Sequence, residues 1–217
     1  AERNRLGGGP WVVEAILGAD MCHHFDKFHV AKLCERSPLY ARAMELFEDI
    51  GDIRRCMGFV AATPQNHEQL VKFFGTMTAE NGLIALNDLL QNRSNEALVV
   101  KIATSYSEQL EPEELIKLFE SHKSINGLFY YLGAIVNTSE NAEVHFKYIQ
   151  AAVKVGQIRE VERICRESKY YDPEIVKNYR KEAKLSDQLP LIIVCDRYNY
   201  VRDLVMYLYK NEQRKYI

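Results

Sequence analysis

Apolar residues recur at spacings of three and four along most of the chain, which is the period that returns side chains to one face of an α-helix. Short breaks separate these segments, and none of them shows the sustained alternation of apolar and polar residues expected of a half-buried strand. The pattern predicts helices over residues 10–18, 25–36, 39–49, 52–61, 64–74, 78–91, 95–109, 112–122, 125–137, 141–155, 157–168, 173–184, 188–197 and 199–212. We therefore predict an all-α protein with no strands.

Several of these helices begin with a recognisable local signal. Asp172 offers a side-chain oxygen to the first free amide groups of a helix, and Pro173 then fits the first turn, where no backbone donor is needed. Thr63-Pro64 and Glu111-Pro112 place a proline at the same tolerated position. Short helices with short connections favour pairs of helices that pack as hairpins.

The chain contains an internal repeat. Residues Asp26–Arg36 align without gaps on residues Asp187–Arg197, which places Cys34 on Cys195. At the same offset, the apolar stripe of the next helix also repeats: Tyr40, Ala43, Leu46 and Phe47 fall on Val201, Leu204, Tyr207 and Leu208. The same stripe returns between these two copies, after Gly156, in Ile158, Val161, Ile164 and Cys165. A helix, a tight turn and a second helix thus form a reused unit.

A single hairpin of this kind cannot bury its own apolar face, whereas stacked hairpins share one core. The repeat therefore predicts an α-solenoid, a superhelical stack of short helix hairpins. Residues 1–9, which end in Gly7-Gly8-Gly9, lack an apolar period and are expected to form a flexible leader. No proline- or serine-rich linker interrupts residues 10–217, so we expect one continuous solenoid segment there, cut from a longer protein.

Charge and cysteine content narrow the class of protein. The 28 Lys and Arg residues are balanced by 30 Asp and Glu residues and mixed with them, which argues against binding to nucleic acid or to an anionic membrane surface. The longest apolar run, Leu189–Cys195, is far shorter than the roughly 20 residues that span a bilayer. Five widely spaced cysteines suit reduced thiols in the cytoplasm better than a disulfide framework.

Candidate chemistry is sparse. The densest group of potential metal ligands is Cys22, His23, His24, His29 and Cys34, but no Cys-x-x-Cys pair is present, and Cys34 aligns with Cys195 in a segment without histidines. Cys165 and Cys195 lie on apolar helical stripes, where a thiol usually packs as a small buried hydrophobe. We therefore predict no catalytic, cofactor-binding or metal-binding residues and no enzymatic activity.

One cationic stripe stands out as a candidate binding patch. Its members lie at positions i, i+3, i+4 and i+7 of one predicted helix: Lys177, Arg180, Lys181 and Lys184. Two interpretations remain open. The stripe is either a solvated helix face, interleaved with Glu174 and Glu182, or a surface that contacts an acidic partner.

Several long strings resemble the leg repeats of the clathrin heavy chain family. They are HFKYIQAA at 145–152, GQIREVERICRES at 156–168 and LPLIIVCDR at 189–197, with shorter matches at 118–121, 127–130 and 203–209. The resemblance covers nearly everything after residue 10 and is strongest over 112–217. It implies a rod of helical hairpins in the distal part of the leg of a triskelion, the three-legged unit of the clathrin coat.

The resemblance also implies a function and partners. A leg segment packs against neighbouring heavy-chain legs and so builds the polyhedral lattice on vesicles in endocytosis and intracellular trafficking, at the cytosolic face of coated pits and coated vesicles. Light chains and adaptors of the family bind outside this segment, and contact with the cofactors that uncoat vesicles is compatible with a distal position. No nucleic acid, no cofactor and no direct membrane insertion are expected.

Two other function classes remain open alongside a coat leg. A helical-solenoid adaptor or tether of another vesicle-trafficking complex would share the architecture but bind defined peptides along one face. An all-helical metal enzyme would use the histidines near residue 23. Peptide-binding assays and metal analysis distinguish these alternatives from a structural coat segment.

Overall fold

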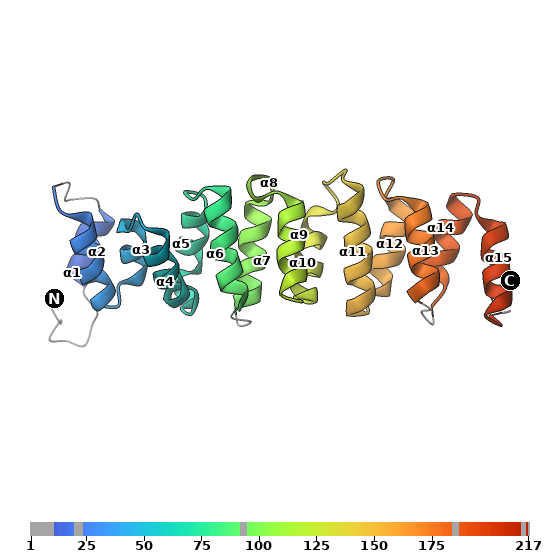
Figure 1. The fold of residues 1–217 in the computed structure, drawn as a ribbon, viewed down its shortest axis with the longest axis horizontal. Coiled ribbons are helices and arrows are strands. Elements are labelled where there is room, and N and C mark those ends of the chain that lie inside the picture. The colour runs from blue at the N-terminus through green and yellow to red at the C-terminus, as the bar shows by residue number, and fades with distance from the viewer. Residues whose placement is uncertain (1–10, 20–23, 92–94, 184–186, 214–215, 217) are drawn as a thin grey trace. The chain divides into compact units, whose positions relative to one another are not determined.

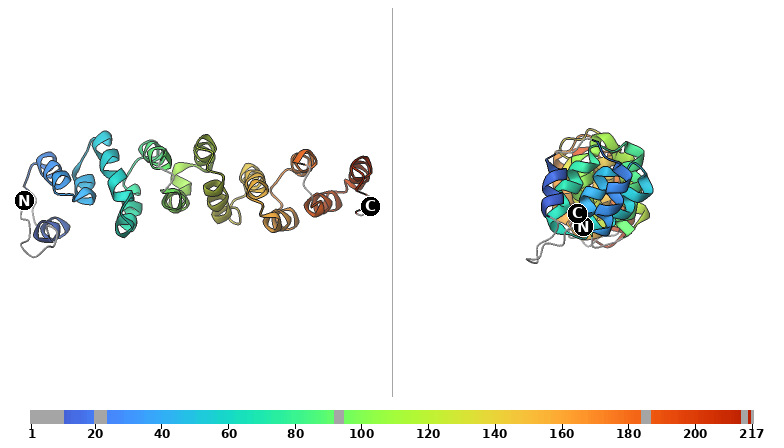
Figure 2. Two further views of the ribbon diagram at one scale, coloured as in Figure 1. Left: turned by 90° about the horizontal axis from the view of Figure 1, so that it is seen from below. Right: turned by 90° about the vertical axis from the view of Figure 1, so that its left-hand side faces the viewer.

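The computed structural model describes residues 11–19, 24–91, 95–183, 187–213 and 216, and for residues 11–14 only the backbone. The described residues form helices and connecting turns and contain no strand, as the sequence predicts. The chain divides into two compact units, residues 1–118 and 119–217, with the boundary inside one helix. In each unit, consecutive helices follow one another in chain order (Figure 1, Figure 2).

Unit 1 is a stack of short helices joined by tight turns. Its elements are α1 (Trp11–Gly18), α2 (Lys27–Arg36), α3 (Tyr40–Leu46), α4 (Ile50–Ala61), the 3₁₀ helix η1 (Pro64–Asn66), α5 (His67–Phe74), α6 (Ala79–Gln91), α7 (Glu96–Ser105), α8 (Ser107–Leu110) and the first part of α9 (Pro112–Ser121). The main helix contacts join near neighbours in sequence: α2 packs on α3, α4 on α6 and α5 on α7. Packing restricted to near neighbours is the hallmark of a solenoid.

The core of unit 1 runs along these helix contacts. Its largest fully buried side chains come from α3, α4, α5, α6, α7 and α9: Met44, Met57, Leu70, Leu86, Ile102, Leu115 and Ile116. Side chains cap the starts of α2 and α4, because the carboxylates of Asp26 and Asp49 accept hydrogen bonds from backbone amides in the first turns of these helices. Helices α2 and α4 therefore have both a capped beginning and a buried face.

The described residues of unit 2 form the remainder of α9 and six further helices. These are α10 (Ile125–Ile135), α11 (Ala142–Val155), α12 (Ile158–Glu167), α13 (Pro173–Ala183), α14 (Leu189–Arg197) and α15 (Val201–Lys210). Again the helices contact near neighbours: α10 packs on α11, α11 on α12, α12 on α14, and α14 on both α13 and α15. Both units are thus all-α solenoid stacks of helix hairpins, which confirms the predicted fold class.

Two turns of unit 2 show how the sequence sets its hairpins. Gly156 ends α11 in the left-handed conformation, with φ of +82°, and Gln157 donates its backbone N–H to the carbonyl of Ala152 at 2.8 Å. At the start of α13, the Asp172 carboxylate accepts the backbone N–H of Glu174 at 2.8 Å. The predicted cap at Asp172 is therefore confirmed.

The internal repeat corresponds to real helix pairs. The segment around Cys34 forms α2 and its copy around Cys195 forms α14, and both thiols are buried. The following stripe forms α3 and α15, where Ala43 and Leu204 are both buried at equivalent positions. Val201 departs from the predicted stripe, because 47% of its surface is exposed.

Two predicted helices are each split in the structure. The segment 64–74 begins as η1 and continues as α5, and the segment 95–109 breaks at Tyr106 into α7 and α8. The backbone of Tyr106 departs from helical geometry. Its side-chain hydroxyl donates a hydrogen bond of 2.8 Å to the carbonyl of Val71 on α5. That long-range contact is invisible to local periodicity.

The predicted flexible leader at residues 1–9 lies outside the described residues. The continuity of residues 10–217 as one solenoid stays a prediction, since the two units are each described separately. No helix in the described part of the chain is long and apolar enough to cross a membrane.

Candidate functional site

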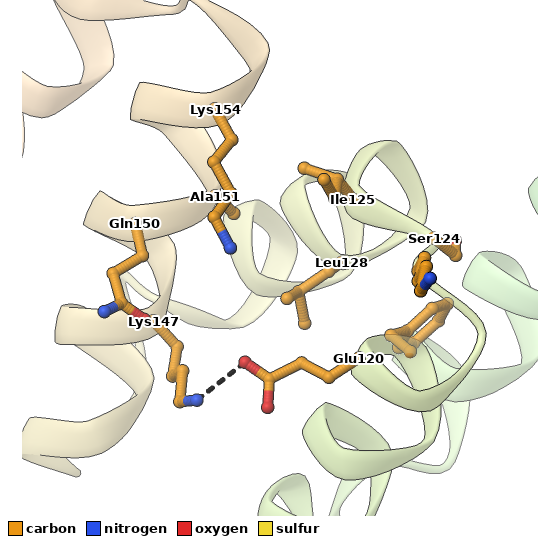
Figure 3. A pocket seen from close by; sticks show the side chains of 10 residues that line it. Glu120, Ser124, Ile125, Leu128, Lys147, Gln150, Ala151 and Lys154 are labelled. Atoms are coloured by element: carbon orange, nitrogen blue, oxygen red, sulfur yellow. Dashed lines mark hydrogen bonds and ion pairs between the residues drawn. The ribbon is translucent and has the colours of Figure 1, made fainter.

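A groove with a volume of about 270 Å³ opens on the surface of unit 2 (Figure 3). One wall comes from the end of α9 and the start of α10, and the other comes from α11. We call it the basic groove, after the three lysines among the residues that line it: Phe119, Glu120, Lys123, Ser124, Ile125, Leu128, Lys147, Gln150, Ala151 and Lys154.

The α11 wall is built by helical spacing. Lys147, Gln150, Ala151 and Lys154 lie at i, i+3, i+4 and i+7, so they share one face of the helix. Figure 3 shows their side chains on the side of α11 that faces α10. The buried positions Tyr148, Ile149 and Ala152 occupy the adjoining face and anchor α11 in the core.

The opposite wall depends on a tight turn between α9 and α10. Lys123 adopts a left-handed backbone conformation with φ of +54°, which reverses the chain just after α9. The backbone N–H of Ser124 then donates to the carbonyl of Phe119 at 3.0 Å and closes the turn. The turn thus brings the Lys123 side chain and the first residues of α10 to the rim of the groove.

The floor of the groove is apolar and fixed in position. Phe119 is fully buried and stacks on Tyr131, with 5.6 Å between ring centroids. Leu128 and Ala151 are almost fully buried beside it, whereas Ile125 is 39% exposed at the edge. A ligand entering the groove would therefore meet packed hydrocarbon rather than a loose surface.

The rim carries an excess of positive charge. Lys147 donates to the Glu120 carboxylate at 2.6 Å, so the one acidic side chain of the groove is paired across it (Figure 3). Lys123 and Lys154 are exposed, and the ammonium group of neither forms a hydrogen bond or ion pair with another of the described residues. Two ammonium groups thus remain available to an anionic partner.

The structure places the predicted cationic stripe of α13 differently from the sequence interpretation. Lys177 and Arg180 are buried, with exposed fractions of 5% and 2%, and Lys181 is half-buried. Lys184 lies outside the described residues. The solvated-face interpretation therefore does not hold for Lys177 and Arg180, and contact of the stripe Lys177, Arg180, Lys181 and Lys184 with an acidic partner stays a prediction.

The burial of these two cations has specific causes. The ammonium of Lys177 lies 3.0 Å from the Asp203 carboxylate and 4.0 Å from the centre of the Tyr200 ring, both contributed by the α14–α15 turn and α15. Pairing with Lys177 lowers the pKa of Asp203. Arg180 donates to the backbone carbonyl of Asp187, and burial lowers the pKa of its guanidinium. Sequence spacing on α13 alone contains no sign of these partners.

The predicted burial of the Cys34, Cys165 and Cys195 thiols is confirmed. Cys34, Cys56, Cys165 and Cys195 are buried, and burial raises the pKa of Cys56 to about 11 and that of Cys165 to about 12. A thiol with so high a pKa carries almost no thiolate near neutral pH and is a poor nucleophile. Cys22 and His23 lie outside the described residues, and within the described ranges no group of three or more His, Cys, Asp or Glu side chains is arranged to hold a metal ion.

A second cavity in unit 2, of about 310 Å³, lies beside His145 between α11 and α12. Several of its polar groups already bond to one another or to nearby backbone carbonyls. The His145 ring donates to the Ser139 carbonyl at 2.8 Å and accepts from the Ser168 hydroxyl at 3.0 Å, while Arg163 donates to Asn137 at 3.0 Å. This cavity therefore looks like a hydrogen-bonded joint between helices, and the basic groove is the better candidate for binding.

Sequence reasoning missed the basic groove. The one signal it held was the polar face of α11, with Lys147 and Lys154 seven residues apart in the HFKYIQAA segment and the residues after it. The turn at Lys123 gave no local signal, because lysine is not a residue that favours the left-handed conformation.

Comparison with known proteins identifies clathrin heavy chains as relatives of this chain. Residues 103–217 match a family described as a region in clathrin and VPS proteins. The chain is 55% identical to the clathrin heavy chain of Drosophila melanogaster over 98% of its length, and 53% identical to clathrin heavy chain 2 of Homo sapiens over 96%. It is 54% identical to probable clathrin heavy chain 1 of Caenorhabditis elegans over 100% of its length. It spans 13% of each of these relatives.

Proposed function

This chain belongs to the clathrin heavy chain family, and we propose that it is a leg segment of the clathrin coat. In this role it packs against neighbouring heavy-chain legs and contributes to the polyhedral lattice on vesicles in endocytosis and intracellular trafficking. Its contribution is mechanical, and the proposal assigns it no catalytic step. The coat lies on the cytosolic face of coated pits and coated vesicles.

The observation that carries this proposal is the pattern of packing. The main helix contacts within each unit join near neighbours in sequence, and the residues buried by these contacts include parts of the strings that resemble clathrin leg repeats, such as Leu191, Val194 and Cys195. A stack held together by neighbour contacts presents a long lateral surface for its size. Many weak lateral contacts then add by avidity, while each contact stays reversible.

We propose further that the two units form one continuous stack through the boundary in α9. No proline- or serine-rich linker lies there, and α9 is an uninterrupted helix from Pro112 to Ser121. A compact protein of 217 residues has a radius of gyration of roughly 17 Å. Small-angle X-ray scattering should give a clearly larger value, and a value close to 17 Å would rule out the continuous stack.

The partners follow from the same proposal. Other heavy-chain legs are the direct partners, whereas light chains and adaptors bind the full-length heavy chain outside this segment. Cofactors that dismantle coats are compatible with this position. Neither nucleic acid binding nor direct insertion into a membrane is part of the proposed role.

A replacement experiment in cells tests the proposal. The corresponding segment of a full-length clathrin heavy chain is replaced by residues 11–217, and the chimera is expressed in cells depleted of their own heavy chain. We expect coated-pit formation and endocytic uptake to recover. The adaptor-or-tether alternative predicts that the chimera is stable and recruited to no coat, because an adaptor segment lacks the lateral contacts of a leg.

A further inference from the structure

We propose that the basic groove binds a short acidic peptide segment of a partner protein, with one large apolar side chain of the peptide inserted between α10 and α11. This inference goes beyond the proposed coat function, because it concerns a partner other than a neighbouring leg. The groove is one surface of unit 2 and is complete within that unit (Figure 3).

The size and floor of the groove favour an apolar anchor. Its volume of about 270 Å³ is at the low end for small-molecule pockets and suits a single large side chain with part of its backbone. The floor formed by Phe119, Leu128 and Ala151 is hydrocarbon, and Ile125 offers a further apolar edge that is 39% exposed. An anchor seated there would cover this edge and remove apolar area from water.

The charges favour acidic residues beside the anchor. Lys123 lies on the α9–α10 turn and Lys154 near the end of α11, so the two exposed ammonium groups come from opposite walls. Glu120 is held by Lys147 at 2.6 Å and therefore does not present an unpaired negative charge to an incoming carboxylate. Carboxylates on either side of the apolar anchor would each find a lysine, which supplies orientation as well as attraction.

A small polyanion fits the groove less well than an acidic peptide. Phosphate sites are usually lined by free backbone N–H groups, and those of the turn are already used: Lys123 donates to the Glu120 carbonyl at 3.0 Å and Ser124 to the Phe119 carbonyl at 3.0 Å. The α11 wall is the middle of a helix, so its backbone donors are also engaged. A phosphate group would therefore find no free backbone donor on the α11 wall or at Lys123 and Ser124 of the turn.

The groove is also organised before any ligand arrives. The Phe119–Tyr131 stack fixes the floor, and the Lys147–Glu120 pair links α11 to the end of α9. A binding surface that needs little rearrangement loses less free energy on association. The expected complex is a side chain docked in a preformed slot with a charged rim.

Fluorescence polarisation on the 217-residue chain tests the inference with a labelled peptide in which one phenylalanine is flanked by glutamates. Two comparison peptides replace the phenylalanine by alanine or the glutamates by lysines, and tripolyphosphate serves as a competitor. We expect the first peptide to bind more tightly than both comparison peptides and to lose affinity as the salt concentration rises. Tripolyphosphate should compete poorly.

Charge reversal locates the site. The double variant Lys123→Glu/Lys154→Glu should weaken binding by about tenfold, because it replaces two attractive rim contacts with repulsive ones. The control Lys101→Glu/Lys210→Glu changes the net charge equally at two exposed lysines outside the groove and should bind within about twofold of the original chain. Ile125→Ala, at the partly exposed edge, should weaken binding without a change in far-ultraviolet circular dichroism.

Three outcomes would overturn the inference. The first is that the labelled peptide does not bind at millimolar protein. The second is that the alanine peptide or tripolyphosphate binds as tightly as the phenylalanine peptide. The third is that the groove variant and the control variant lose the same affinity for the peptide. The second would reduce the groove to a cationic surface that binds anions without an apolar anchor. Because the assay needs no coat, its failure leaves the coat proposal untouched, and a failure of coat assembly leaves peptide binding to be judged separately.

Discussion

Replacing Ile149 by alanine should open a cavity in the helix stack of unit 2. Ile149 lies on α11, is 0% exposed, and belongs to a helix that packs on both α10 and α12. The change deletes carbon atoms worth roughly 2 kcal/mol of transfer free energy, and the cavity left behind raises the total to about 3 kcal/mol. The free energy of local unfolding of α10, α11 and α12 should fall by that amount.

Hydrogen exchange measured by mass spectrometry suits this test, because a helical array need not unfold in one step. Peptides from α10 to α12 should exchange faster in the variant, whereas those from α4 to α6 should change little. Arg159→Ala on α12 is the matched control, since Arg159 is exposed and should cost no more than about 0.5 kcal/mol. Equal exchange in Ile149→Ala and in this control would refute the shared-core reasoning.

Further variants test the joints between helices. Gly156→Ala should lower the free energy of unfolding measured in urea by about 1 kcal/mol, because φ of +82° disfavours any residue with a side chain. The cost is one of backbone conformation, since nothing lies within 4 Å of the added carbon. Gly156→Asn should cost less, because asparagine tolerates the left-handed conformation better. The Arg197 guanidinium donates to three backbone carbonyls at or just beyond the end of α12. Arg197→Met should therefore lower the hydrogen-exchange protection of the last turn of α12 by about 1 kcal/mol. Unchanged hydrogen-exchange protection in that turn would contradict this reasoning. Burial and the hydrogen bond to Glu160 raise the pKa of the Tyr148 hydroxyl to about 12. The unfolded chain loses the same proton near pH 10, whereas the folded chain still holds it. The free energy of unfolding should therefore fall between about pH 10 and pH 12. Tyr148→Phe should make that fall less steep, and an identical pH profile would argue against it.

Most of the fold follows from features that are local in sequence. The three-and-four spacing of apolar residues locates the helices, and the cap at Asp172 and the turn at Gly156 mark two of the boundaries correctly. The repeat that pairs Cys34 with Cys195 predicts the solenoid, because each copy forms the same helix pair. What these features share is that neighbours in sequence are neighbours in space.

The errors arise where a distant partner decides the outcome. The break in the segment 95–109 accompanies a hydrogen bond from Tyr106 to Val71 on another helix. The burial of Lys177 depends on Asp203, which lies 26 positions further along the chain. Helical spacing on α13 could group the cations of one stripe, but it could not show that the stripe turns inward.

The basic groove needed the structure for the same reason. Lys123 and Lys154 belong to different elements, and only the reversal at Lys123 together with the packing of α10 on α11 brings them to one rim. Nothing in the composition of either segment predicts a concave surface between them. The floor, in contrast, could be anticipated, since Phe119 and Leu128 both fall on apolar stripes.

The most direct test of the leg assignment is assembly of a purified chimeric heavy chain. A full-length clathrin heavy chain carrying residues 11–217 in place of its own corresponding segment is brought to cage-forming conditions, and the products are counted by electron microscopy. We predict closed polyhedral cages in a yield close to that of the unaltered heavy chain. Intact three-legged molecules that fail to close into cages would contradict the account.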